Sequence, residues 1–154
     1  MIMPTVAKYM TPSPHTIQAE VNAQIAVNMM KRFNVRHLPV LNGKKLVGIL
    51  SDRDLKTIAC ITALDGFEVR QVMTKNPYSV KAAASLSDVA TAMARNKYGA
   101  AIVVGLKEEI LGIITTVDLA RVLSSILKAI PAGTSAVEDI TKMLHSGSGP
   151  RWRG

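Results

Sequence analysis

The sequence is poor in cysteine and in aromatic residues, and each shortage narrows the kinds of protein it can encode. Cys60 is the only cysteine among 154 residues, which excludes an intrachain disulfide and a cysteine-based zinc site. Its apolar neighbours predict a buried thiol on a helix. The aromatic residues are two Phe, three Tyr and one Trp, too few to predict a stacking platform for nucleic-acid bases.

Long apolar runs are also missing. No run approaches the ~20 residues that a membrane-spanning helix needs, and residues 1–10 lack the apolar core of a signal peptide. We therefore expect a cytoplasmic protein that does not associate with membranes. Charged residues make up only 19% of the chain, below the usual share, so an oligomer is expected to cover part of the neutral surface.

The residues that are abundant are aliphatic and basic. Hydrophobic residues make up 48% of the chain, and their aliphatic character favours buried strands covered by helices. The net charge is +8. Such an excess suits an anionic partner, whether a phosphate, a nucleic acid or a membrane surface. A solvated basic surface accounts for the charge equally well.

Two parts of the chain repeat each other in the same order. Residues 6–17 align with residues 69–80 at an offset of 63, and both segments contain a Met-Thr pair, Met10-Thr11 and Met73-Thr74. Residues 48–55 align with residues 112–119 at an offset of 64. An ordered duplication of this kind predicts two copies of one structural unit.

Each copy is typical of a strand, a helix, two strands and a second helix. A Pro-containing turn leads to a short extended piece that ends at Ile17 or Val80. Apolar residues then recur at helical spacing, at Val21, Ile25, Met29 and Phe33 in the first copy, with Ala26 and Met30 beside them, and at Leu86, Val89, Ala90 and Met93 in the second. Strands are expected at residues 38–41, 46–50, 100–104 and 110–114, with Asn42-Gly43 as the first hairpin turn. The second helices are expected at residues 55–63 and 119–127.

The predicted fold class is α/β, of the α+β type, with two β-α-β-β-α repeats packed about a pseudo-twofold axis. Residues 6–63 form the first repeat and residues 69–128 the second. One unit is too small for independent stability, so the two should pack on each other. Residues 129–154 are expected to form a short helix, opened by a capping box at Ser135 and Glu138 and ending near Leu144, and then a flexible basic tail.

A Gly-x-x-Ser/Thr-x-x-Asp motif occurs once in each copy and joins a strand to a helix. The spacing of Ser51 and Asp54, and of Thr115 and Asp118, is that of a capping box. A helix N-terminus after a buried strand also suits a phosphate, and an Asp can accept hydrogen bonds from a ribose diol. The spacing leaves the cap and the ligand site equally open, and both can hold for the same residues.

These motifs, together with the segment from Val35 to Val40, resemble a tandem pair of cystathionine-β-synthase (CBS) domains, the Bateman module. The resemblance covers roughly residues 6–128. It implies that AMP, ADP, ATP or S-adenosylmethionine binds as a regulatory ligand in clefts between the repeats, with AMP the first candidate. It also implies a homodimer.

The resemblance assigns roles to the matching positions. Asp54 and Asp118 would hold ribose hydroxyls, and Ser51 and Thr115 would lie near the ribose or phosphate. The other expected nucleotide-binding residues, which would form the adenine wall and complete the pockets, are Thr16, Ile17, Arg36, His37, Leu38, Pro39, Arg53, Ser79, Val80, Gly99, Ala100, Ala101 and Thr116.

The two sites are not expected to be equal. Arg36, His37 and Arg53 of the first copy are basic, whereas Gly99, Ala100 and Val117 stand in the matching places of the second. The family places phosphate-binding basic groups of one repeat opposite the ribose-binding Asp of the other. The pocket of Asp118 is therefore predicted to be the better phosphate site, and that of Asp54 to be empty or to take a less anionic ligand.

Neither catalysis nor a resident metal is expected. No nucleophile, base and orienting residue form a recognisable set, and His37 has no partner ligand at a metal-binding spacing. We expect a regulatory or sensor module whose output passes through an unknown partner protein or a change of dimer geometry. The main alternative is a nucleic-acid-binding protein that uses the basic surface and the tail residues Arg151 and Arg153. An enzyme acting on nucleotides is the weaker alternative.

Overall fold

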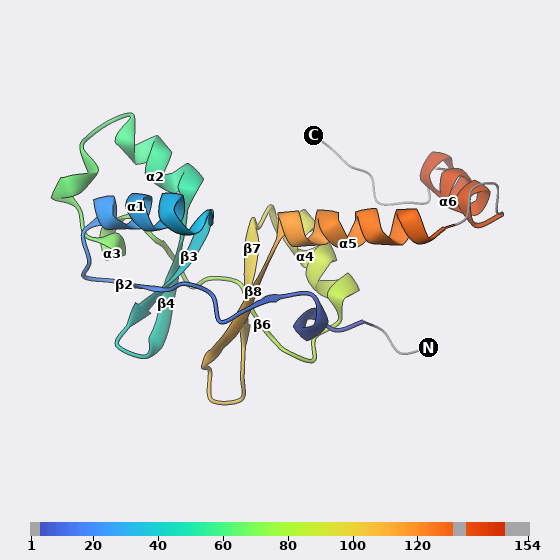
Figure 1. The fold of residues 1–154 in the computed structure, drawn as a ribbon, viewed down its shortest axis with the longest axis horizontal. Coiled ribbons are helices and arrows are strands. Elements are labelled where there is room, and N and C mark those ends of the chain that lie inside the picture. Colours follow the sequence, from blue (N-terminus) through green and yellow to red (C-terminus); the bar gives the residue numbers. More distant parts are fainter. Residues whose placement is uncertain (1–3, 131–134, 147–154) are drawn as a thin grey trace. The chain divides into compact units, whose positions relative to one another are not determined.

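The computed structural model describes residues 4–130 and 135–146 (Figure 1). The chain divides into two compact units, residues 1–118 and 119–154, and each is described by itself. The elements of the first half are η1 Val6–Lys8, β1 Thr11–Pro12, β2 Ile17–Gln18, α1 Ala23–Phe33, β3 His37–Asn42, β4 Lys45–Ser51, α2 Asp52–Ala59 and η2 Leu64–Gly66. Those of the second half are α3 Val69–Val72, β5 Thr74–Lys75, β6 Ser79–Lys81, α4 Leu86–Asn96, β7 Ala100–Val104, β8 Ile110–Thr115, α5 Thr116–Ala129 and α6 Ser135–His145.

The predicted β-α-β-β-α order is present in both copies, as β2-α1-β3-β4-α2 and as β6-α4-β7-β8-α5. The helices after the first strands begin and end alike. The side chains of Asn22 and Ser85 cap α1 and α4, and both helices end on a left-handed residue, Asn34 or Lys97. The duplicated sequence therefore produces duplicated local structure.

The two sheets exchange their edge strands. One sheet has the order β2-β3-β4-β5 and the other the order β1-β8-β7-β6. In this way β1, at the start of the first repeat, pairs with β8 of the second, with Thr11 opposite Ile113. In return β5, at the start of the second repeat, pairs with β4 of the first, with Thr74 opposite Ile49. The reciprocal exchange is the relation that a pseudo-twofold axis between the repeats produces.

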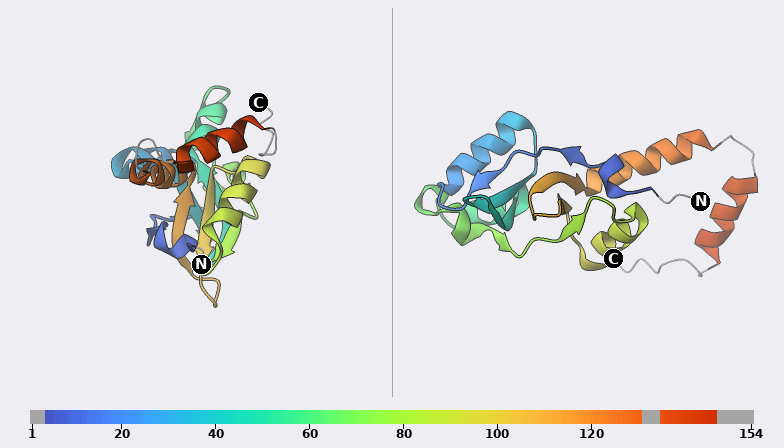
Figure 2. Two further views of the ribbon diagram at one scale, coloured as in Figure 1. Left: turned by 90° about the vertical axis from the view of Figure 1, so that its right-hand side faces the viewer. Right: turned by 90° about the horizontal axis from the view of Figure 1, so that it is seen from below.

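The helical turns before these edge strands cross over as well. The N–H of Val6 donates to the carbonyl of Ala84, and the N–H of Val69 donates to the carbonyl of Val21. Figure 2 shows the N-terminal segment continuing from the sheet of β8 to the sheet of β3. Because each repeat completes the other's sheet, the two depend on each other for their packing.

Two glycines make room for the exchanged strands. A methyl group at Gly112 would lie 2.9 Å from the carbonyl oxygen of Thr11 and even closer to Met10 Sδ. Gly48 has the same relation to Thr74 and Met73. The Gly that opens each Gly-x-x-Ser/Thr-x-x-Asp motif thus serves the close approach of the edge strand.

The core of the first sheet is built from small and aliphatic side chains. Helices α1, α2 and α3 contact one another and the strands of this sheet (Figure 1). The inward face of α1 carries the buried residues Ala23, Ala26 and Met30. The predicted stripe is rotated from this face, because Ile25 and Phe33 are exposed. Ala26 and Met30, which the sequence placed beside this stripe, are buried, and Val21 and Met29 of the stripe pack against the core.

Two local predictions need correction. The first hairpin turns at Gly43-Lys44, because Asn42 still pairs with Lys45, and Gly43 takes the positive φ of 60° that this turn position favours. Cys60 is exposed, contrary to the predicted buried thiol. Helix α2 ends at Ala59 and buries Leu55, so Cys60 lies beyond its end.

The second unit contains most of α5, and α6. No side chain of α5 is buried, and Leu123, Ile126 and Leu127 are exposed. Helix α6 covers the region predicted to be helical, whereas the basic tail with Arg151 and Arg153 lies outside the described residues. Among the residues that are described, no helix combines the length and apolar character needed to cross a membrane.

Candidate functional site

Each Gly-x-x-Ser/Thr-x-x-Asp motif forms a reciprocal cap at a strand-to-helix junction. Ser51 Oγ donates to Asp54 Oδ2 at 2.6 Å and accepts from the Asp54 N–H at 3.1 Å. At the other junction Thr115 Oγ1 donates to Asp118 Oδ2 at 2.7 Å, and the Thr115 N–H donates to the same oxygen at 2.9 Å. The expectation of a cap is confirmed in both copies, and these cap hydrogen bonds use Oδ2 of each carboxylate.

The residues that precede the central strands are joined to the same junctions. The N–H of Asp52 donates to the carbonyl of Arg36 at 2.9 Å, and the N–H of Thr116 donates to the carbonyl of Gly99 at 3.1 Å. In the sheets His37 lies opposite Ser51, and Ala100 lies opposite Thr115. The segments predicted at 36–39 and 99–101 therefore adjoin the first turns of α2 and α5.

The two junctions meet through His37. A methyl group on Gly99 would lie 2.8 Å from His37 Nε2, so the imidazole of the first repeat lies against the backbone of the second. Gly99 in turn holds the N–H of Thr116 at the start of α5. This contact brings the basic segment of the first repeat beside the Thr115–Asp118 junction.

The surroundings of His37 keep its ring neutral at pH 7. Burial, the largest influence, lowers the pKa of His37 below its usual 6.5. The Asp54 carboxylate acts in the opposite direction and raises this pKa, whereas the Arg36 and Arg53 guanidinium groups lower it. Asp52 contributes a smaller raising influence. Arg36 and Arg53 are exposed, so this end of the first repeat presents positive charge to solvent.

The predicted adenine-binding segments lie at β6 and at the start of β2, which Thr16 directly precedes. Ile17 is buried and pairs in parallel with Val40, and Ser79 and Val80 pair with Ile102 and Val103. Ser79 is exposed and Thr16 is half-buried. The Ser79 hydroxyl donates to the carbonyl of Pro77 at 3.1 Å.

An aromatic pair beside each segment was missed by the sequence analysis. His15, directly before Thr16, stacks on Phe33 with ring centroids 3.8 Å apart. Tyr78, directly before Ser79, stacks on Tyr98 at 5.0 Å. The signal was an aromatic or imidazole ring at the same place in both copies, 63 residues apart.

Several predicted residues belong to the core. Leu38, Pro39 and Ala101 are fully buried, and Ala100 is buried as well. Their side chains pack inside the sheet layers, so only their backbone groups could contact a ligand. Thr116 is exposed on the first turn of α5.

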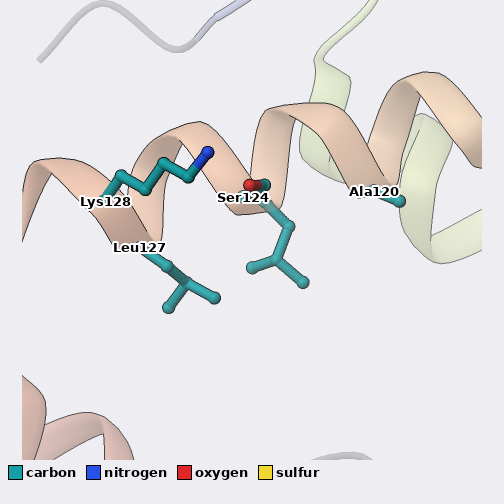
Figure 3. A pocket seen from close by; sticks show the side chains of 5 residues that line it. Ala120, Ser124, Leu127 and Lys128 are labelled. Carbon is teal, nitrogen blue, oxygen red and sulfur yellow. The ribbon is translucent and has the colours of Figure 1, made fainter.

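A shallow hollow lies on one face of α5, and none of its lining residues belongs to the predicted nucleotide site. Its lining is Ala120, Leu123, Ser124, Leu127 and Lys128 (Figure 3). The lining is mostly aliphatic. Across residues 4–130 and 135–146, no three His, Cys, Asp or Glu side chains gather as a metal site would require.

The fold and the paired junctions define a class of protein: two β-α-β-β-α repeats with exchanged edge strands and a capped helix after each hairpin. A family model for the CBS domain matches residues 6–59 and 69–125. The chain therefore belongs to the CBS domain family and carries a tandem pair of these domains.

One curated relative and two solved structures illustrate the similarity. An inosine-5′-monophosphate dehydrogenase of Korarchaeum cryptofilum is 31% identical over 104 residues, which are 68% of this chain and 21% of the relative. The CBS-pair protein CBSX2 from Arabidopsis thaliana is 26% identical with a TM-score of 0.72, over 84% of this chain and 100% of that one. A structure of CBSX2 in complex with AMP is 28% identical with a TM-score of 0.68, over 79% and 97%. The chain spans about a fifth of the length of the first curated relatives that it matches.

Proposed function

We propose that this CBS pair is a regulatory module that binds an adenosine nucleotide, AMP first, where the two repeats meet. The observation that carries the proposal is the contact of His37 with Gly99, because it gathers a basic segment, a ribose-type acid and a helix N-terminus at one place. The CBSX2 structure in complex with AMP supports the choice of ligand. The module acts by changing a partner protein or a dimer and performs no chemistry itself.

The proposed roles follow the geometry of the junctions. Asp118 accepts hydrogen bonds from the ribose hydroxyls. Arg36 and Arg53, which belong to the first repeat, attract the phosphate. Thr16 and Ser79 offer polar groups to adenine, each beside an aromatic pair. The second repeat has the uncharged Gly99, Ala100 and Val117 at the positions that match Arg36, His37 and Arg53 of the first, so we propose that the site of Asp54 binds AMP more weakly.

The test compares two matched variants, Asp118→Asn and Asp54→Asn. Asn keeps a side-chain oxygen that can accept the cap hydrogen bond, so thermal unfolding should stay similar in both variants. A hydrogen bond to a charged group contributes about 1.5–3 kcal/mol, so Asp118→Asn should weaken AMP binding by about 10–100-fold in calorimetry. A larger loss from Asp54→Asn would contradict the asymmetry, and no AMP binding by the unaltered protein would contradict the proposal.

A homodimer is part of the same proposal. Helix α5 carries Leu123, Ile126 and Leu127 more than half exposed, and contiguous exposed apolar side chains mark interaction surfaces. A second copy of the chain is the partner that the low share of charged residues favours. Light scattering on a size-exclusion column measures the dimer with and without AMP.

Binding of nucleic acid is the alternative that the same protein sample can test. It would rest on the net charge of +8 and on the tail, which lies outside the described residues. A gel shift with random DNA or RNA that disappears at ~0.2 M salt and ignores AMP would indicate plain electrostatic attraction. A shift that AMP abolishes would instead indicate that nucleic acid occupies the nucleotide site.

A further inference from the structure

Among the ionisable side chains of the predicted site, His37 is the one that lies against the backbone of the other repeat. It starts β3 opposite Ser51, and its Nε2 atom faces the backbone of Gly99 in the second repeat, where any side chain would collide with it. Its counterpart opposite Thr115 is Ala100. The imidazole is therefore present at only one of the two junctions.

The charges around the ring come mainly from its own repeat. Arg36 precedes it, and Asp52, Arg53 and Asp54 lie on the first turn of α2. The second repeat faces the ring with Gly99, which carries no charge. Lys97 and Tyr98 precede that glycine, and Asp118 is the acid of the adjoining junction.

Burial lowers the pKa of His37, so the free protein holds the ring neutral at pH 7. A phosphate placed beside Arg36 and Arg53 would bring negative charge next to the ring and favour its protonated form. Binding of an anion and uptake of a proton are then linked, since each favours the other. An uncharged nucleoside supplies no such charge and leaves the ring neutral.

We propose that His37 determines the specificity of the nucleotide site for a phosphate-bearing ligand, by taking up a proton when the phosphate binds. The inference rests on the proposed nucleotide site and adds that its preference for AMP over adenosine grows as the pH falls. Each unit by which the bound phosphate raises the pKa of His37 makes the preference about tenfold larger at low pH.

The experiment measures AMP and adenosine binding by calorimetry between pH 8 and pH 5.5, in the unaltered protein and in His37→Gln. We expect the ratio of AMP affinity to adenosine affinity to rise more steeply towards low pH in the unaltered protein than in the variant, by at most about tenfold for each unit by which bound AMP raises the pKa of His37. The phosphate of AMP titrates near pH 6 itself, but it does so equally in both proteins. His145→Gln, at an exposed position of α6, should behave like the unaltered protein.

A second variant and a direct observation guard against a misfolded His37→Gln. Gly99→Ala should displace the ring, because the added methyl lies 2.8 Å from Nε2, and should reduce the pH dependence of the AMP-to-adenosine ratio in the same way. In the unaltered protein, NMR titration of the His37 ring should give a higher pKa with AMP bound than with adenosine bound.

The possible failures are distinct. Equal pH dependence in the unaltered protein and in His37→Gln, or an unchanged His37 titration on adding AMP, overturns the role of His37 while AMP binding itself stands. Failure of both ligands to bind at every pH overturns the nucleotide site, and this proposal with it.

Discussion

The exchange of edge strands predicts an unusual cost for a small substitution, Gly112→Ala. The added methyl would lie 2.9 Å from the Thr11 carbonyl oxygen, and this oxygen belongs to the backbone of the paired strand, so it cannot swing away as a side chain could. Overpacking of this kind costs about 1–3 kcal/mol. Replacing Gly by Ala also stiffens the unfolded chain, which offsets about 0.4–1 kcal/mol.

Gly66→Ala is the matched control, because a methyl at Gly66 meets no atom within 4 Å and only the stabilising contribution remains. The difference between the two variants isolates the collision, at about 1–3 kcal/mol. For a chain of this length that is about 2–12 °C in Tm. Urea unfolding and thermal scans of both variants measure it. If Gly112→Ala proved as stable as Gly66→Ala, β1 would not lie against β8 and the exchanged sheets would be refuted.

Three further predictions concern the cap, the buried imidazole and the surface of α5. Ser51→Ala should cost about 1 kcal/mol by urea unfolding through loss of the N-cap, whereas the exposed Thr57→Ala on the same helix should be neutral or slightly stabilising. Because folding lowers the pKa of His37, the unfolded chain takes up a proton at a higher pH than the folded chain, and the free energy of unfolding should fall as the pH drops below about 6.5. His37→Gln should reduce this fall. An equal fall in the variant and in the unaltered protein would contradict the burial of His37. Leu123→Glu should shift the light-scattering mass from dimer to monomer, and an unchanged mass would show that α5 does not form the interface.

Much of the fold could be predicted because its helices and strands follow from local sequence patterns, and these patterns occur in both copies. The apolar run at residues 100–104 became β7, and the apolar spacing from Leu86 to Met93 became α4. The exchange of strands could not be predicted in this way, since Thr11 pairs with Ile113 and two-residue strands leave no periodic signal. The exposure of Cys60 was missed because the apolar residues around it suggested a helix that continues, whereas α2 ends at Ala59.

In the candidate site, too, the local features could be predicted from the sequence and the contacts between repeats could not. The helix caps at Ser51 and Thr115 follow from spacing within four residues, and the structure confirms both, with the full capping box at Thr115. The approach of His37 to Gly99 depends on how two repeats pack, and a sequence pattern carries no record of it. The basic residues of the first repeat could be identified from the sequence. That Gly99 leaves room for the His37 ring could be seen only in the folded structure.

The central claim is that an adenosine nucleotide binds where the two repeats meet, and NMR mapping of AMP binding tests it most directly. We expect saturable shifts of the backbone amides of His37, Gly99 and Thr116, which lie together at the junction. The absence of saturable shifts, or shifts confined to Lys44 and Lys45 on the exposed basic hairpin, would contradict a nucleotide site between the repeats.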